Sequence, residues 1–211
     1  MQTAFGLSIP ETIAEATRPE TTALIVYDMQ VGILRQLPHG GAVLEQVLKV
    51  LAAARAAGVR VIFMRHMSLP KRLAGVFQLR QMMMRQRKSS PEDVHPWFLR
   101  DDPAFALSPE LQVREDEAVL DKITMSAFEG TPLSIALRDC GLKSFVLCGV
   151  ATEIGIEPTV RHGADLGFIP IVVENACGGG HADAAERAVA NMRFMGDAMF
   201  TAVEEISMVW S

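Results

Sequence analysis

The sequence has no long apolar run, no excess of basic residues and only three cysteines among its 211 residues. None of its apolar stretches reaches the roughly 18 to 20 residues of a membrane span, and the N-terminus lacks the basic-then-apolar pattern of a signal peptide. The formal net charge of -5 argues against a nucleic-acid or anionic-membrane surface, because those partners usually require a basic face. We therefore expect a cytoplasmic protein that contacts neither nucleic acid nor a membrane.

The cysteines and histidines show no pattern typical of a disulfide framework or a metal site. Cys140, Cys148 and Cys177 are odd in number and lie in or beside predicted core elements, which favours free buried thiols. No two histidines have metal-ligand spacing, and the glycine run 178–180 lacks the lysine and Ser/Thr of a phosphate loop. We expect no bound metal and no cofactor.

Short apolar segments alternate with helical patterns along most of the chain. Apolar runs that end in polar residues predict strands, and 3.6-residue spacing followed by a glycine predicts helices. The predicted strands cover residues 23–27, 59–64, 119–120, 145–150, 169–173 and 199–203, and the predicted helices cover 43–57, 131–140, 154–166 and 182–195. This alternation predicts an α/β fold of three layers, in which a doubly wound, Rossmann-like sheet of about six parallel strands is covered by helices on both faces.

Residues 67–117 interrupt this alternation with a Met-rich stretch, a basic run and a Pro-spaced segment. About fifty residues is too long for an ordinary connection, so we expect part of this region to be helical and the rest to form a cap or an oligomer contact. Residues 1–20 are predicted to form an irregular arm with a short helix at 12–16. The sequence shows no internal repeat, so we expect one domain over 1–211 that forms a homo-oligomer, a dimer or a tetramer.

Three candidate functional groups follow the ends of different predicted strands. Asp28 follows the first strand, Lys122 the third, and a turn that contains Gly155 the fourth. Ligands of a doubly wound sheet gather beyond the carboxyl ends of its strands, so we expect the three to converge. Taken singly, Asp28 is also explained as a helix cap and Lys122 as a solvated lysine. A nearby lysine favours the ionised acid whereas burial favours the protonated one, so the direction of the pKa shift stays open.

Three segments of the chain resemble the signature segments of the isochorismatase-like hydrolases, in the same order and with the same spacing. They are IVYDMQ at 25–30, DKITMSAF at 121–128 and CGVATEIGIEPTVRHGADLGFIPIVVENAC at 148–177, and the resemblance extends from about residue 22 to residue 206. It implies a hydrolase that acts on a small molecule. In the amidase branch of that family an Asp moves the proton, a Lys stabilises charge and a Cys attacks a carbonyl. Asp28 and Lys122 match the first two by position.

The third position departs from the amidase pattern, because Gly155 stands where that branch has its cysteine. Glycine has no side chain that could form a covalent intermediate. Cys148 lies inside an apolar run and Cys140 precedes a helix-stop glycine, so Cys177, at the end of the next strand, is the one reserve nucleophile. A thiol nucleophile is therefore not expected.

The other branch of the family also carries Gly at this position and cleaves the vinyl ether of isochorismate-type substrates. The resemblance implies that Asp28 protonates the enol-ether carbon and that water captures the oxocarbenium ion, which requires an Asp28 pKa raised by an apolar pocket. That branch usually has an aromatic residue where this chain has Ala151, and the sequence Ala-Thr-Glu is similar to the amidase branch. The substrate therefore stays open.

Substrate-binding residues are expected around the same sheet edge. A carboxylated substrate needs cations, and Arg65, His66 and Arg72 follow the second strand. Arg72 is preferred because its guanidinium can pair both carboxylate oxygens. The family resemblance implies a cis peptide at Val150–Ala151 and an anion-binding set of amides at the start of the next helix. Phe128, at the end of the second segment, completes the expected substrate-binding set.

Three functions follow from these observations. The first is a hydrolase of a small carboxylated molecule that needs no cysteine, with vinyl-ether cleavage as its example. The second is a C–N amidohydrolase whose cysteine has been lost or replaced at position 155. The third is a non-catalytic protein that retains the pocket for binding.

Overall fold

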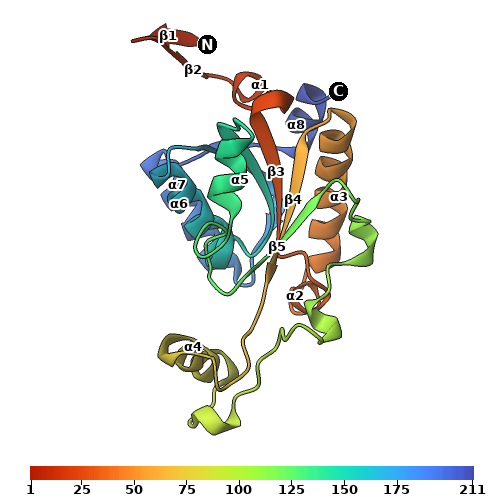
Figure 1. The fold of residues 1–211 in the computed structure, drawn as a ribbon, viewed down its shortest axis with the longest axis vertical. Helices are drawn as coiled ribbons and strands as arrows, with labels where there is room; N and C mark the ends of the chain where they lie inside the picture. The colour runs from red at the N-terminus through yellow and green to blue at the C-terminus, as the bar shows by residue number, and fades with distance from the viewer.

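The computed structural model describes residues 1–211 and has the predicted three-layer α/β architecture (Figure 1). Six parallel strands form one sheet in the order β5-β4-β3-β6-β7-β8. They are β3 (Thr22–Tyr27), β4 (Arg60–His66), β5 (Ala118–Lys122), β6 (Ser144–Val150), β7 (Ile169–Gly178) and β8 (Met199–Thr201). The strand order reverses direction between β3 and β6, and this is where a doubly wound sheet binds its ligands.

The two central strands, β3 and β6, are buried along their whole length. Helices cover both faces of the sheet, so the strands are apolar runs rather than alternating patterns. At their first residues Thr22 and Ser144 are polar, and their hydroxyl oxygens lie 2.8 Å apart in a hydrogen bond. That bond meets the requirement that buried polar groups be paired.

Two helical layers enclose two separate cores (Figure 1). One face of the sheet is covered by α3 (Gly40–Ala56), α8 (Val203–Val209) and α1 (Ile13–Ala16), and the other by α5 (Leu133–Asp139), α6 (Glu157–Asp165) and α7 (Ala182–Met195). Apart from Gly40 at its first residue, the buried residues of α3 are Val47, Val50, Leu51 and Ala54. Their spacing of three and four residues places them on one face of the helix, as sequence periodicity predicts.

Residues 67–117 extend from the carboxyl edge of the sheet and carry α4 (Val76–Gln86), which stands apart from the body of the fold in Figure 1. Three 3-10 turns follow it: η2 (Pro91–Asp93), η3 (Pro103–Phe105) and η4 (Pro109–Leu111). The structure therefore confirms that part of this region is helical. It also brings η3 beside α2 (Val31–Leu34), next to the end of β3.

The N-terminal arm and the C-terminal end differ from the sequence prediction. The arm holds an antiparallel pair, β1 (Gln2–Ala4) and β2 (Leu7–Ile9), that the short turn between them makes possible. The last strand ends at Thr201, and the predicted strand residue Val203 instead begins α8. Its backbone N–H donates to Asn175 Oδ1 at 2.8 Å, and this side-chain contact was not visible in the apolar pattern.

The cysteines differ from the prediction at one position. Cys140 is exposed, contrary to the prediction of three buried thiols, because it caps α5 on the solvent side. Cys148 lies in the core, as predicted. No helix is long and apolar enough to cross a membrane.

Candidate active site

The structure brings together Asp28 and Lys122, which the sequence placed after different strands. Lys122 Nζ lies 2.8 Å from Asp28 Oδ2, and the two side chains are only 1% and 9% exposed. Lys122 Nζ also donates to the carbonyl oxygen of Thr124 at 3.3 Å. Asp28 Oδ1 is buried without a hydrogen-bond partner, so one oxygen of this carboxyl is free to hold a proton.

The electrostatics of the pair answer a question that the sequence left open. Burial raises the pKa of Asp28 to about 6, and the nearby Lys122 charge offsets only part of that effect. Burial likewise lowers the pKa of Lys122, against the influence of Asp28. Removal of both groups from water therefore disfavours both charges. Asp28 can carry a proton under mildly acidic conditions even with a lysine beside it.

A chamber of about 300 Å³ opens beside Asp28. Its polar lining comes from Asp28, Gln36, His66, Arg85 and His181. Its remaining walls are mostly apolar and consist of Tyr27, Ile33, Leu37, Trp97, Phe98, Met125, Val150, Ala151 and Ile154. A mostly apolar cavity with a few convergent polar groups is typical of a small-molecule site. Of the expected substrate-binding residues, Val150, Ala151 and His66 line it.

Gly155 also lines the chamber, and its surroundings are filled by Tyr27. A Cβ atom placed on Gly155 would lie 2.5 Å from Cζ of Tyr27 and nearer still to its hydroxyl oxygen, whereas real Cβ atoms essentially never approach closer than 3.0 Å. The Tyr27 hydroxyl donates to the carbonyl oxygen of Met125, and Tyr27 is only 1% exposed. Sequence reasoning missed Tyr27 because a tyrosine at the end of an apolar run looks like an ordinary core residue.

The turn around Gly155 does not form the expected anion-binding set of amides. Residues Thr152–Ile156 form a π-helical turn, η5, in which the N–H groups of Ile154, Gly155 and Ile156 donate to the Ala151 carbonyl oxygen at 3.1, 2.9 and 3.2 Å. Those three amides are therefore engaged within the turn and do not point at a ligand. The peptide bond Val150–Ala151 is cis, as the family resemblance implied.

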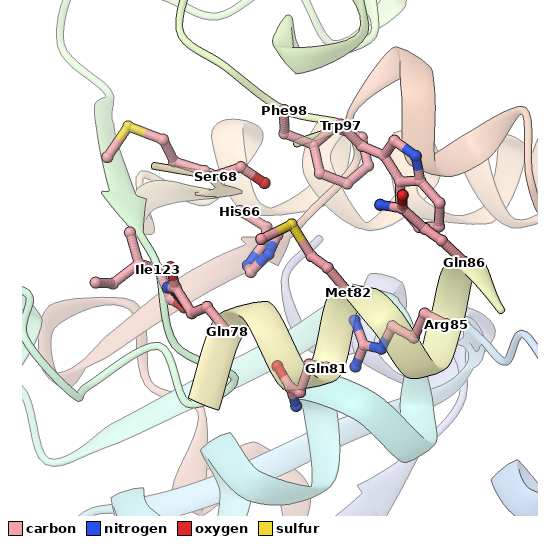
Figure 2. Close-up of a pocket in the computed structure, with 11 residues that line it drawn as sticks. His66, Ser68, Gln78, Gln81, Met82, Arg85, Gln86, Trp97, Phe98 and Ile123 are labelled. Atoms are coloured by element: carbon pink, nitrogen blue, oxygen red, sulfur yellow. Dashed lines mark hydrogen bonds between the residues drawn. The ribbon is translucent and has the colours of Figure 1, made fainter. Parts of the chain in front are cut away.

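The cation that reaches the chamber is Arg85 rather than the predicted Arg72. Arg72 is exposed and does not line the chamber, whereas Arg85 reaches it from α4. A smaller hollow of about 60 Å³ shares Arg85 and His66 with the chamber. Figure 2 shows the residues that line it along α4. The basic run at 85–88 was visible in the sequence, but the path of the long segment that carries it was not.

His66 contributes a neutral imidazole to the chamber. Burial, together with the charges of Lys122 and Arg85, lowers the pKa of His66 to about 3. Its ring packs edge-on against Phe98, with centroids 6.0 Å apart. Behind it, the side chain of Gln30 holds the ends of β3 and β4 together, because its Oε1 accepts from the His66 backbone N–H at 2.6 Å.

Phe128 lies in the core rather than in the chamber. It stacks on Phe168 with centroids 5.7 Å apart and meets Phe145 edge-on at 5.4 Å. It does not line the chamber, so its position does not support the predicted substrate-binding role.

Cys177 does not reach the chamber either. Its Sγ donates weakly to the Leu147 carbonyl oxygen at 3.7 Å, and burial raises its pKa to about 12. The thiolate is the nucleophilic form of cysteine, and a pKa this high disfavours it. The structure therefore does not support Cys177 as a reserve nucleophile.

The glycine-rich loop at 178–181 forms part of the chamber wall through Gly180 and His181. Glu153 Oε1 accepts from the backbone N–H groups of Gly180 and His181 at 2.8 and 3.0 Å. The turn that holds Gly155 thus fixes this loop. No group of three or more His, Cys, Asp or Glu side chains is placed so that it could hold a metal ion.

The chain is similar to known proteins in sequence and in fold. A family model described as the isochorismatase domain matches residues 22–205. The chain is 32% identical over 184 residues to the ureidoacrylate amidohydrolase RutB of Acinetobacter baylyi, covering 80% of this chain and 74% of that protein. It is also 32% identical over 192 residues to the isochorismatase family protein YecD of Escherichia coli O157:H7, covering 89% and 95%.

A solved structure of an isochorismatase family protein from Burkholderia thailandensis superposes on this chain with a TM-score of 0.73 at 28% identity. The superposition covers 90% of this chain and 96% of that one. The agreement in fold, together with the match of the family model over most of the chain, settles the family. The chain belongs to the isochorismatase family of hydrolases.

Proposed function

We propose that the protein hydrolyses a small carboxylated molecule without a covalent thiol intermediate, with Asp28 as the general acid. The observation that carries this proposal is the Asp28 carboxyl, whose pKa is raised to about 6 by burial and whose Oδ1 has no partner in the protein. A general acid works best when its pKa lies near the operating pH. Gly155 offers no side chain that could act as a nucleophile.

Hydrolysis of a vinyl ether illustrates the reaction. Asp28 gives its proton to the terminal carbon of the enol ether, which forms an oxocarbenium ion. A water molecule attacks that ion and returns a proton to the Asp28 carboxylate, and the resulting hemiketal breaks down to a carbonyl compound and an alcohol. Lys122, 2.8 Å from Asp28 Oδ2, stabilises the carboxylate after the first proton transfer.

Arg85 binds the carboxylate of the substrate. It lines the chamber and belongs to none of the ion pairs in the protein. A guanidinium pairs both oxygens of a carboxylate, which fixes orientation as well as charge. Neutral His66 beside it supplies a ring nitrogen for a hydrogen bond.

A second candidate function is C–N amide hydrolysis. It is favoured by relatives named ureidoacrylate amidohydrolase, one of which is 32% identical to this chain, and by the retained Asp28–Lys122 pair. It ranks second because the thiol of such a mechanism has no counterpart in the chamber: Cys177 does not line it, and Tyr27 fills the space beside Gly155.

Turnover assays on isochorismate and on a panel of small amides test the proposal. We expect vinyl-ether hydrolysis by the wild-type protein and a loss of roughly a hundredfold or more in Asp28→Asn, the usual scale for removing a general acid. Arg72→Gln is the matched control, because Arg72 is exposed and outside the chamber. Amide hydrolysis without vinyl-ether hydrolysis would favour the second candidate. No turnover of either kind of substrate would favour a non-catalytic binding protein.

We further propose that the protein acts as a homo-oligomer in which α4 contacts a second copy. Helix α4 has no buried residue. The exposed fractions of its apolar residues Val76, Phe77 and Met84 are 87%, 67% and 70%. A helix of this length is marginal without packing against a neighbour. Light scattering of the wild type and of Phe77→Asp tests this: we expect a dimer or tetramer that the variant dissociates, and a monomeric wild type would contradict it.

A further inference from the structure

We infer that Tyr27 and Gly155 are a matched pair, and that residue 27 decides whether position 155 can carry a nucleophile. Tyr27 is then the specificity-determining residue that commits this chamber to attack by water rather than by a protein side chain. The inference deepens the proposed function, because it rests on a site that works without a thiol.

The phenol ring of Tyr27 occupies the space that a side chain at position 155 would need. The Cβ position of Gly155 lies 2.5 Å from Tyr27 Cζ and closer to Cε1 and the hydroxyl oxygen. Any side chain at position 155, of any chemistry, would therefore collide with the phenol ring. Gly155 has no positive-φ backbone that would require glycine, so the collision with Tyr27 is what restricts this position.

The ring of Tyr27 is held in place by its neighbours. Tyr27 ends β3 and is paired on both sides, with Met64 of β4 and with Gly149 of β6. Its hydroxyl donates to Met125, and Lys122 Nζ lies 4.3 Å from the ring centroid. A displaced ring would break the hydrogen bond or push against the lysine that holds Asp28.

The packing around Gly155 differs from that expected in an amidase that has merely lost its cysteine. Removing a buried side chain from an otherwise unchanged site leaves a cavity, because the surroundings relax only partly. Here the volume beside Gly155 is filled by the side chain of Tyr27 from β3. Tyr27 is the only tyrosine in the chain, and the site is complementary to glycine at position 155.

The chemical consequence follows from the state of the phenol. Burial raises the pKa of Tyr27 well above its usual value, and the charge of Asp28 acts in the same direction. The hydroxyl is therefore protonated, and its proton is engaged by the Met125 carbonyl. The chamber thus has a neutral, non-nucleophilic wall beside Gly155.

A set of variants at the two positions tests the inference: Gly155→Cys, Gly155→Ala, Tyr27→Val and Tyr27→Val/Gly155→Cys. Valine suits a buried strand and leaves room for the new side chain. We expect Gly155→Cys to lower Tm by roughly 2 to 12 °C, the scale of overpacking in a chain of this size. Gly155→Ala should lower it similarly, because the collision begins at Cβ. The double variant should lose less stability than the sum of the losses in Tyr27→Val and Gly155→Cys, because each substitution relieves the defect of the other.

Thiol labelling gives a second readout that needs no substrate. With mass spectrometry to locate the label, iodoacetamide should modify position 155 at least about tenfold faster in the double variant than in Gly155→Cys, since only there can the thiol sit in the chamber. Equal stability of Gly155→Cys and wild type, or equal labelling of single and double variants, would overturn the inference. If Gly155→Cys does not fold, recovery of folded protein in the double variant is the expected result, and equal failure of both overturns it.

Failure of the proposed function is visible separately. A wild-type protein inert towards vinyl ethers would remove the proposed reaction, yet the stability and labelling differences would still report whether residues 27 and 155 are coupled. If the protein does cleave vinyl ethers but the effects of the two substitutions on stability are additive, the coupling of residues 27 and 155 is contradicted and the proposed reaction is not.

Discussion

Lys122 Nζ lies 2.8 Å from Asp28 Oδ2 in a buried ion pair that joins residues 94 positions apart in the sequence. Each residue stands at the carboxyl end of its strand, β5 and β3, with β4 between them. The lysine lowers the pKa of Asp28, but burial outweighs that effect and the net pKa is raised to about 6. An acid with a lysine beside it is therefore still able to donate a proton.

Removal of the lysine should make Asp28 a weaker acid. In Lys122→Met the apolar stem is kept and the charge that opposes the burial effect is lost, so the pKa of Asp28 rises further. We expect the alkaline limb of the pH–rate profile to move to higher pH, together with a lower maximal rate because the carboxylate formed in the reaction loses its partner. An alkaline limb that stays in place would show that another group sets it.

The same pKa predicts how folding stability depends on pH. Because the folded-state pKa of Asp28 is raised above its ordinary value to about 6, the folded state binds this proton more tightly than the unfolded state. The contribution of Asp28 to the free energy of unfolding is therefore fully present below about pH 4 and is lost as pH rises towards 6. The total loss is on the order of 2 to 3 kcal/mol. Urea unfolding of wild type and Asp28→Asn between pH 4 and 7 should show this slope only in the wild type.

Arg85 should control affinity for carboxylated substrates. Arg85→Gln is expected to raise KM by roughly ten- to a hundredfold, the range for losing a hydrogen bond to a charged group, with a smaller change in kcat. Arg72→Gln, a matched change in the same exposed region, should leave KM unchanged. Steady-state kinetics with a substrate and its uncharged ester makes the comparison, and an equal effect on both substrates would argue against a carboxylate contact.

Alkylation of the native thiols should not stop turnover. Cys140 is exposed and will react, but it caps α5 away from the chamber, and burial raises the pKa of Cys177 to about 12. Activity within about twofold of the untreated protein is expected after iodoacetamide. Inactivation that substrate prevents and that maps to Cys177 would instead establish a thiol mechanism.

The parts of the site that sequence could predict are those fixed by strand ends. Asp28 and Lys122 follow apolar runs, and in a parallel sheet such positions meet at one edge. The choice of Arg85 over Arg72 depends on the path of residues 67–117, which periodicity does not determine. The sequence also could not show that the ring of Tyr27 lies over Gly155, because that depends on how β3 and the turn after β6 approach each other in space.

The hydrogen bonding of the backbone amides in the turn after β6 could not be predicted from the sequence either. A glycine before a helix favours an anion-binding N-terminus, but the turn after β6 is π-helical and directs the N–H groups of Ile154, Gly155 and Ile156 to the Ala151 carbonyl oxygen. The sequence shows where this helix starts but not how the backbone of its first turn closes.

The most direct test of the account is the pH dependence of kcat/KM for isochorismate hydrolysis by the wild type and by Asp28→Asn. Because Asp28 must be protonated to act as the acid and its pKa is about 6, kcat/KM should be level at low pH and fall about tenfold per unit at higher pH. Asp28→Asn should lack this limb and retain about 1% of the rate or less. A wild-type rate that rises through pH 6 would mean that ionised Asp28 acts as a base, and would contradict the acid mechanism.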